Sequence, residues 1–239
     1  MGANQKIYVN NGGTFTQAQQ IYVNQTGTWK TVKKVYVNQS GSWTQVYPTP
    51  SGSTNYTTAG SYSFTVPAGI YSLTVSVIGG GGGGQYACSF GGDSGSGAGG
   101  GSGGYYSNQV ISVTPKQTIS VTVGAGGSLA TVSCKPGGSG GTSQISGSGI
   151  TTLTATGGNS PDTGNQTYGC KAGGTGGSPN GVQAPTQCTD QGNQGGAQPG
   201  PGATNGTGYG SGGQGGAQYS TGAQNTVGQA GAVLFSWTS

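Results

Sequence analysis

The chain has 239 residues, of which 56 are glycine, 10 are proline and only 4% are charged. Leu, Ile, Val and Phe together make up about 14% of the chain, below the roughly 20% usual for a globular domain. Each glycine lowers the stability of a helix by about 1 kcal/mol. Because glycine is frequent throughout the chain after residue 78, a helix bundle is excluded there. No apolar run reaches the ~18 residues of a membrane span, and the first residues lack a signal peptide's apolar stretch. We therefore expect synthesis in the cytoplasm without a signal peptide, and no membrane insertion.

The chain lacks His, Arg and Glu altogether. A Ser-His-Asp or Cys-His arrangement cannot be built, and no Cys-x-x-Cys pair suggests structural zinc. We expect no catalytic residue, no metal and no cofactor, although an enzyme using Asp, Lys, Tyr or Cys stays the last alternative. A net charge of +4 that comes from a few lysines, without arginine, also argues against a nucleic-acid partner.

The first 47 residues contain a 14-residue repeat. Each unit reads as an alternating strand, a turn rich in Asn and Gly, and a second strand led by a large aromatic residue, which predicts three β-hairpins over 1–47. A lone hairpin is marginal in water, so the units must pack on each other or on a partner. The aromatic residues either form a small core or fasten the hairpins to a trimeric fibre, whose symmetry three equal hairpins would imitate. The candidates for fibre attachment are Tyr8, Phe15, Tyr22, Trp29, Tyr36 and Trp43.

Residues 48–60 read as a turn-rich linker, and strand patterns follow it. Alternating or apolar segments predict strands at 61–66, 70–78, 108–114, 117–123, 142–145, 150–156 and 231–237. These segments hold most of the apolar residues outside the repeats, and they predict an antiparallel β-sandwich. The fold class is therefore all-β, with essentially no α-helix, and 61–239 form a glycine-rich domain.

Between Thr154 and Thr226 the only Leu, Ile, Val or Phe is Val182. Glycines recur there in doublets and in steps of three, the period of a polyproline II helix. Such polyglycine II-like segments can bond laterally, N–H to C=O, without a hydrophobic core. The alternative is a flexible linker, although 73 residues of coil inside a compact domain would be unusual.

All four cysteines interrupt the glycine tracts: Cys88, Cys134, Cys170 and Cys188. If the tracts form rods, the interruptions are loops at the ends of the rods. Disulfide bonds would then link these loops, and four cysteines allow three possible pairings. Four free thiols are the alternative. The same interruptions gather aromatic and charged residues suited to a receptor surface, or simply to filling gaps between loops. These residues are Tyr86, Phe90, Lys135, Asp162, Tyr168, Lys171 and Asp190.

The segment SYSFTVPAGIYSLTVSVIGGGGGG, the later GGSGGYYSNQVISVTPKQTISVTVGAGG and the ending GQAGAVLFSW together resemble a known family. They look like the glycine-rich domain of tail-fibre and receptor-binding proteins of tailed bacteriophages, over about residues 61 to 237. The arrangement also resembles distal tail-fibre adhesins, in which an N-terminal region caps a trimeric fibre and loops between glycine tracts touch the bacterium. The SYSFTVPAG strands depart from an architecture built from polyglycine alone.

The resemblance implies a non-enzymatic virion adhesin at the tip of a tail fibre. Its partners would be a trimeric tail-fibre protein and a bacterial surface receptor, either an outer-membrane protein or a glycan. One alternative is a purely structural fibre or decoration subunit without a receptor role. A second is an ice-binding protein, which would need more regular glycine tracts and a flat Thr/Ala face.

Overall fold

A computed structural model of the chain describes residues 8–11, 13–17, 21–32, 34–47, 51–86, 88–90, 93–95, 97–132, 135–161, 173–184, 208–213 and 226–238. The regular elements in these ranges are all β-strands, paired antiparallel, so the predicted all-β class is confirmed. Within the same ranges, no helix is long and apolar enough to cross a membrane. The strands are β1 Tyr8–Asn11, β2 Thr14–Gln17, β3 Tyr22–Gln25, β4 Thr28–Thr31, β5 Val35–Gln39, β6 Ser42–Tyr47, β7 Gly52–Tyr56, β8 Gly60–Thr65, β9 Ser72–Ile78, β10 Cys88–Phe90, β11 Asp93–Gly95, β12 Tyr105–Ser112, β13 Thr118–Val123, β14 Ser143–Ser146, β15 Leu153–Ala155 and β16 Ala232–Trp237.

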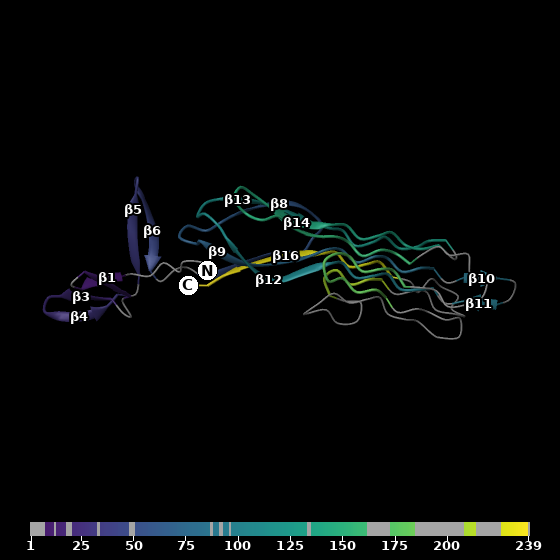
Figure 1. Cartoon of the computed structure of the whole chain (residues 1–239), viewed down its shortest axis with the longest axis horizontal. Coiled ribbons are helices and arrows are strands. Elements are labelled where there is room, and N and C mark those ends of the chain that lie inside the picture. Colours follow the sequence, from purple (N-terminus) through teal and green to yellow (C-terminus); the bar gives the residue numbers. More distant parts are fainter. Residues whose placement is uncertain are drawn as a thin grey trace.

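Eight of these strands form two four-stranded antiparallel sheets (Figure 1). One sheet has the order β12-β9-β16-β7, and the other has the order β15-β14-β13-β8. Side chains alternate along each strand, so apolar residues at every second position can face one side. In β13, for example, Ile119, Val121 and Val123 are buried while the residues between them are exposed.

The buried faces of the two sheets share one hydrophobic core. Phe64 of β8 stacks on Phe235 of β16, with ring centroids 4.4 Å apart and ring planes 8° apart. This contact joins the two sheets directly. Leu73, Val75 and Val77 on one face of β9 are fully buried in the same core. Burial of an apolar side chain stabilises a fold by about 1.5–3 kcal/mol. These few buried residues therefore contribute much of the hydrophobic stabilisation of the two packed sheets.

Strand β7 differs from the sequence-based expectation, because it lies inside residues 48–60, which composition assigned to a linker. It pairs along β16, from Tyr56 opposite Val233 to Gly52 opposite Trp237. Its residues are mostly polar, so the backbone ladder rather than an apolar pattern makes the strand. A Cβ at Gly52 would lie 2.7 Å from the indole of Trp237, so glycine leaves room for that ring. The chain thus enters and leaves the two sheets side by side.

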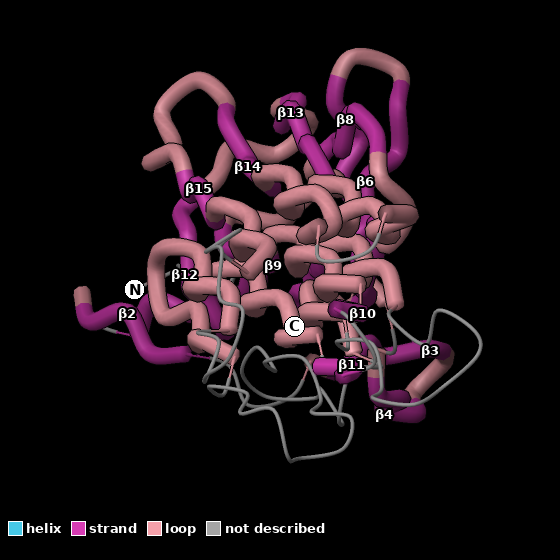
Figure 2. Tube along the Cα trace, turned by 90° about the vertical axis from the view of Figure 1, so that its right-hand side faces the viewer, coloured by secondary structure: helices cyan, strands magenta, loops and turns pink. Residues whose placement is uncertain are grey.

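Beyond the sheets, glycine-rich segments run side by side as a bundle (Figures 1 and 2). Residues 79–86 continue outward from β9, and all but Tyr86 are buried. Every third N–H of this segment donates to the same neighbour, over N···O distances of 2.8 to 3.1 Å. The accepting segments are 98–104 for residues 79, 82 and 85, then 135–141 for residues 80, 83 and 86, and 226–229 for residues 81 and 84. Three residues per turn is the period of a polyproline II helix.

Three successive carbonyl groups of the same segment point to three other neighbours. Those of Gly80, Gly81 and Gly82 accept the N–H groups of Gly158, Gly127 and Gly213. The central segment is therefore surrounded by six others, to which it donates and from which it accepts. Buried backbone groups must find hydrogen-bond partners, and here they find them with almost no side chains involved. The described parts of residues 154–226 take part in this bonding and are held by it.

Close approach explains why these positions are glycine. A Cβ added at each position from Gly79 to Gly83 would come closer than 3.0 Å to a backbone carbonyl of a neighbouring segment. None of these five residues has its φ in the left-handed region, so turn geometry is not the reason. Glycine permits two backbones to approach where any side chain would separate them.

The N-terminal strands form three separate two-stranded sheets, β1–β2, β3–β4 and β5–β6. In the second and third, the two loop residues are Thr26-Gly27 and Ser40-Gly41, and all four have positive φ, from 50° to 88°. This conformation suits the type I′ turn, which matches the twist of a hairpin. Asn24 Oδ1 accepts the N–H of Gly27 at 2.9 Å, and Asn38 accepts that of Gly41 at the same distance. The turn therefore explains why Asn and Gly recur at these two positions of the repeat.

Candidate functional site at the far end of the bundle

The bundle segments are joined to one another mainly at the end remote from the sheets. The chain leaves the bundle there at Tyr86, Ser128, Pro161 and Gly213, and it returns at 98, 135, 173 and 226. In Figure 1 the short hairpin of β10 and β11 marks this end, and Figure 2 looks onto it. The termini of the two-sheet unit lie at its other end, where Gly52 pairs with Trp237. The molecule therefore has two different ends. The chain enters and leaves the sheets at one of them, and the connections between bundle segments lie at the other, which we call the loop end.

Two predicted receptor residues, Tyr86 and Lys135, are brought together at the loop end. The Tyr86 N–H donates to the carbonyl of Lys135 at 3.0 Å, and the Lys135 N–H donates to Val132 at 3.1 Å. Tyr86 is half-buried and Lys135 is exposed. The backbone thus fixes where an aromatic ring and a cation leave the bundle.

The buried side chain of Gln85 helps to close the first of these connections. Its backbone N–H donates to the carbonyl of Ala98 at 2.9 Å, and its side-chain Oε1 accepts the N–H of Ala98 at 3.3 Å. Gln85 is 1% exposed, and Ala98 is fully buried. A polar side chain that is buried and bonded in this way adds rigidity next to the loop end.

The structure adds exposed aliphatic residues that sequence reasoning missed. Leu129 is 41% exposed and Val132 is 58% exposed, both in the connection from 128 to 135, and Val227 is 46% exposed where the chain returns. The signal was present in the sequence, because Leu129 and Val132 are isolated apolar residues between glycine tracts. Together with Tyr86 and Lys135 they give this end a mixed apolar and cationic surface.

The other predicted loop residues cannot be placed in this surface. Phe90 ends β10, and Cys88 begins it, but only their backbone is described. The remaining predicted residues lie outside the described part of the chain: Asp162, Tyr168, Lys171, Asp190, Cys134, Cys170 and Cys188. Their roles in recognition and in disulfides stay predictions.

Aromatic residues of the predicted fibre-attachment set lie on the hairpins, and four of them are exposed. Trp29 and Trp43 are 68% and 70% exposed, and Tyr22 and Tyr36 are 50% and 46% exposed. Tyr8 and Phe15 lie in β1 and β2, where the structure describes the backbone alone. In the second and third hairpins these four rings are therefore largely open to solvent.

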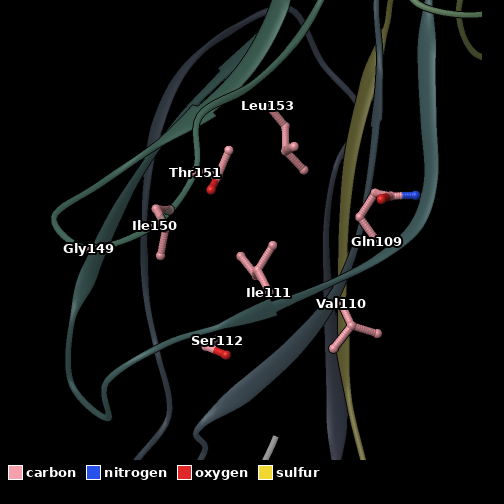
Figure 3. A pocket seen from close by; sticks show the side chains of 8 residues that line it. All are labelled: Gln109, Val110, Ile111, Ser112, Gly149, Ile150, Thr151 and Leu153. Carbon is pink, nitrogen blue, oxygen red and sulfur yellow. The ribbon is translucent and has the colours of Figure 1, made fainter. Parts of the chain in front are cut away.

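A groove of about 390 Å³ opens between the edge strands β12 and β15 (Figure 3). Ile111, Ile150 and Leu153 line it, and none of the lining residues that the structure describes is charged. Ile111 and Leu153 also belong to the hydrophobic core, so the groove is the open side of the two sheets. Across the described ranges, no group of three or more Cys or Asp residues gathers as metal ligands would.

Residues 55–236 match the protein family described as a glycine-rich domain. The match covers β8 through most of β16, together with the whole described bundle. The chain belongs to this glycine-rich domain family. A comparison with curated proteins found no matching relative. The family thus accounts for the two sheets and the bundle, and the three hairpins lie before its first residue.

Proposed function

We propose that this glycine-rich protein is an adhesin of a tailed-phage virion. Its N-terminal hairpins fasten it to the tip of a trimeric tail fibre, and the loop end of its bundle binds a receptor on the bacterial surface. The observation that supports this best is the polarity of the molecule. The chain enters and leaves the sheets at one end, while the connections between bundle segments gather at the other.

The bundle suits an adhesin because it holds its connections in place through the backbone. Residues 79–86 bond to neighbours on every side, so the points from which connections depart are fixed. Loops that are held before binding lose less conformational entropy when they meet a receptor. Several fibres on one particle would then turn individually weak contacts into firm attachment.

A purely structural fibre or decoration subunit is the second candidate, and one observation is equally consistent with it. The exposed Leu129 and Val132 are aliphatic, and a neighbouring subunit would cover such residues as readily as a receptor would. The two functions differ in what the free protein does. An adhesin binds cells by itself, whereas a structural subunit does not.

The test uses labelled full-length protein and a bacterial strain susceptible to the phage that carries it. We expect the protein to bind the cells and to reduce adsorption of that phage. The double variant Leu129→Asn/Val132→Asn should bind at least about tenfold more weakly, since losing two contacts of about 1 kcal/mol each exceeds the roughly 1.4 kcal/mol of a tenfold change. Val110→Asn is the matched control, because Val110 is 66% exposed on β12, away from the loop end. Absence of cell binding by the unchanged protein would contradict the receptor role.

A further inference from the structure

The second and third hairpins present the same set of side chains on one face. In antiparallel strands, directly opposite residues share a face. Asn24 lies opposite Trp29, and two positions along the same face Tyr22 lies opposite Thr31. The third hairpin repeats this arrangement with the pairs Asn38–Trp43 and Tyr36–Gln45. Each of the two hairpins therefore carries an aromatic face with one Trp and one Tyr, which we call the indole face.

The indole faces are too exposed to stabilise the hairpins by themselves. Trp29 and Trp43 leave about two-thirds of their surface in solvent, and each hairpin is a two-stranded sheet. A two-stranded hairpin is marginally stable at best in water. A tryptophan that is covered by a partner contributes strongly to binding. These faces therefore have the character of contact surfaces.

Charge is distributed unevenly between the hairpins and the rest of the chain. Residues 1–47 contain four lysines and no acidic residue, whereas residues 48–239 contain three lysines and three aspartates. The whole net charge of +4 thus belongs to the hairpin region. Two of these lysines, Lys30 and Lys34, are exposed, and the other two, Lys6 and Lys33, lie outside the described residues.

We infer that the hairpins dock on an acidic protein surface that offers an equivalent apolar recess to each indole. This inference rests on the proposed attachment to a fibre and adds the chemistry of the fibre's docking surface. A second copy of this chain is disfavoured as the occupant, because it would bring two regions of charge +4 together. Recesses must be equivalent because the two indoles occupy the same register in their hairpins. A symmetric trimer supplies repeated surfaces of this kind.

In this arrangement the lysines and the tryptophans act at different stages. Lysines outside the buried part of an interface mainly speed association and make it sensitive to salt. Lys30 is such a residue, because it lies opposite Val23 on the other face of its hairpin from Trp29. Tryptophans buried at the centre of the interface mainly slow dissociation. The two contributions are therefore separable by measuring rates, and that separation is the basis of the test.

The probe is tail fibre isolated from particles that lack this chain, and binding of the full-length protein is followed by surface plasmon resonance. Trp29→Ala/Trp43→Ala should weaken binding at least about 30-fold, mostly through faster dissociation. Lys30→Gln/Lys33→Gln/Lys34→Gln should lower the association rate about tenfold at low salt. Raising NaCl from about 50 mM to about 500 mM should lower the association rate of the unchanged protein by a similar factor. Val110→Ala on β12 and Lys116→Gln in the turn before β13 are the matched controls. Trp29→Phe/Trp43→Phe should restore part of the affinity, since a ring is kept.

The possible results separate this inference from the function it rests on. If the unchanged protein does not bind fibres at all, the attachment role and the acidic docking surface both fail. If it binds fibres with an association rate that neither salt nor the lysine substitutions alter, attachment stands and the acidic surface is overturned. Binding to immobilised heparin or duplex DNA that is tighter than binding to fibres, and that requires both tryptophans, would assign the indole faces to a polyanion and would also overturn the inference.

Discussion

Replacing Gly81 with alanine tests whether close backbone packing holds the glycine-rich bundle together. Gly81 donates its N–H to Gln229 at 2.9 Å, and its carbonyl accepts the N–H of Gly127 at 2.7 Å. An added Cβ would overlap the carbonyl of Ser211, which itself accepts the N–H of Gln229 at 2.8 Å. One methyl group at this position therefore disturbs three hydrogen bonds between four segments.

The expected loss follows from those three bonds. A hydrogen bond contributes about 1 kcal/mol to net stability, so weakening all three costs about 3 kcal/mol. Overpacking a tightly packed interior costs a similar amount, about 1–3 kcal/mol. In a domain of about 150–250 residues each kcal/mol shifts the Tm by roughly 2–4 °C. The Gly81→Ala protein should therefore melt about 6–12 °C below the unchanged protein.

Thermal unfolding followed by calorimetry measures this difference, and Gly147→Ala is the matched control. Gly147 follows β14, and a Cβ there would meet its nearest neighbour, the carbonyl of Thr118, at 3.3 Å. Its φ is not in the left-handed region, so this variant should change stability by less than about 1 kcal/mol. Equal melting temperatures for Gly81→Ala and Gly147→Ala would refute the packing argument.

Three further outcomes are expected. Phe235→Ala removes the ring that stacks on Phe64 between the sheets, so denaturant titration should show a loss of about 3–5 kcal/mol. Burial raises the pKa of Tyr56 above its usual value near 10. The contribution of Tyr56 to the free energy of unfolding should therefore be intact below pH ~10 and should fall as the pH rises further. Urea titrations at stepped pH would show this dependence, and the Tyr56→Phe protein should lack it. Deletion of residues 1–50 should leave the Tm of the sheets unchanged within about 2 °C in a calorimetric scan, because the hairpins form their own sheets; a larger drop would show that the hairpins stabilise the rest.

Much of the sheet structure is readable from the sequence because apolar residues alternate there. β9 and β13 lie within the segments predicted at 70–78 and 117–123, and β16 lies within 231–237. Strand β7 was missed because its residues, GSTNY, are polar or small and have no apolar alternation. β7 forms because its backbone pairs with that of β16. The two strands are far apart in the sequence, so local sequence patterns do not reveal this pairing.

The partners within the bundle were not predictable for a related reason. Glycine steps of three suggest the helical period, but they carry no information on which segment lies beside which. Gly81 bonds to Gln229 and Gly127, far apart along the chain, and no side chain marks either pairing. The loop end followed from the rod argument, whereas the exposed Leu129 and Val132 were not predicted, because a single aliphatic residue between glycine tracts can be either buried or exposed.

Hydrogen exchange of individual backbone amides tests the central claim most directly. That claim is that a segment almost without side chains keeps a fixed structure through hydrogen bonds between backbones. The amides of Gly80, Gly81 and Gly82 should exchange about as slowly as those of Val75 and Val77 in β9, because all of them are buried and bonded. Exchange of the three glycine amides at the rate of an unfolded peptide, while the β9 amides stay protected, would contradict it.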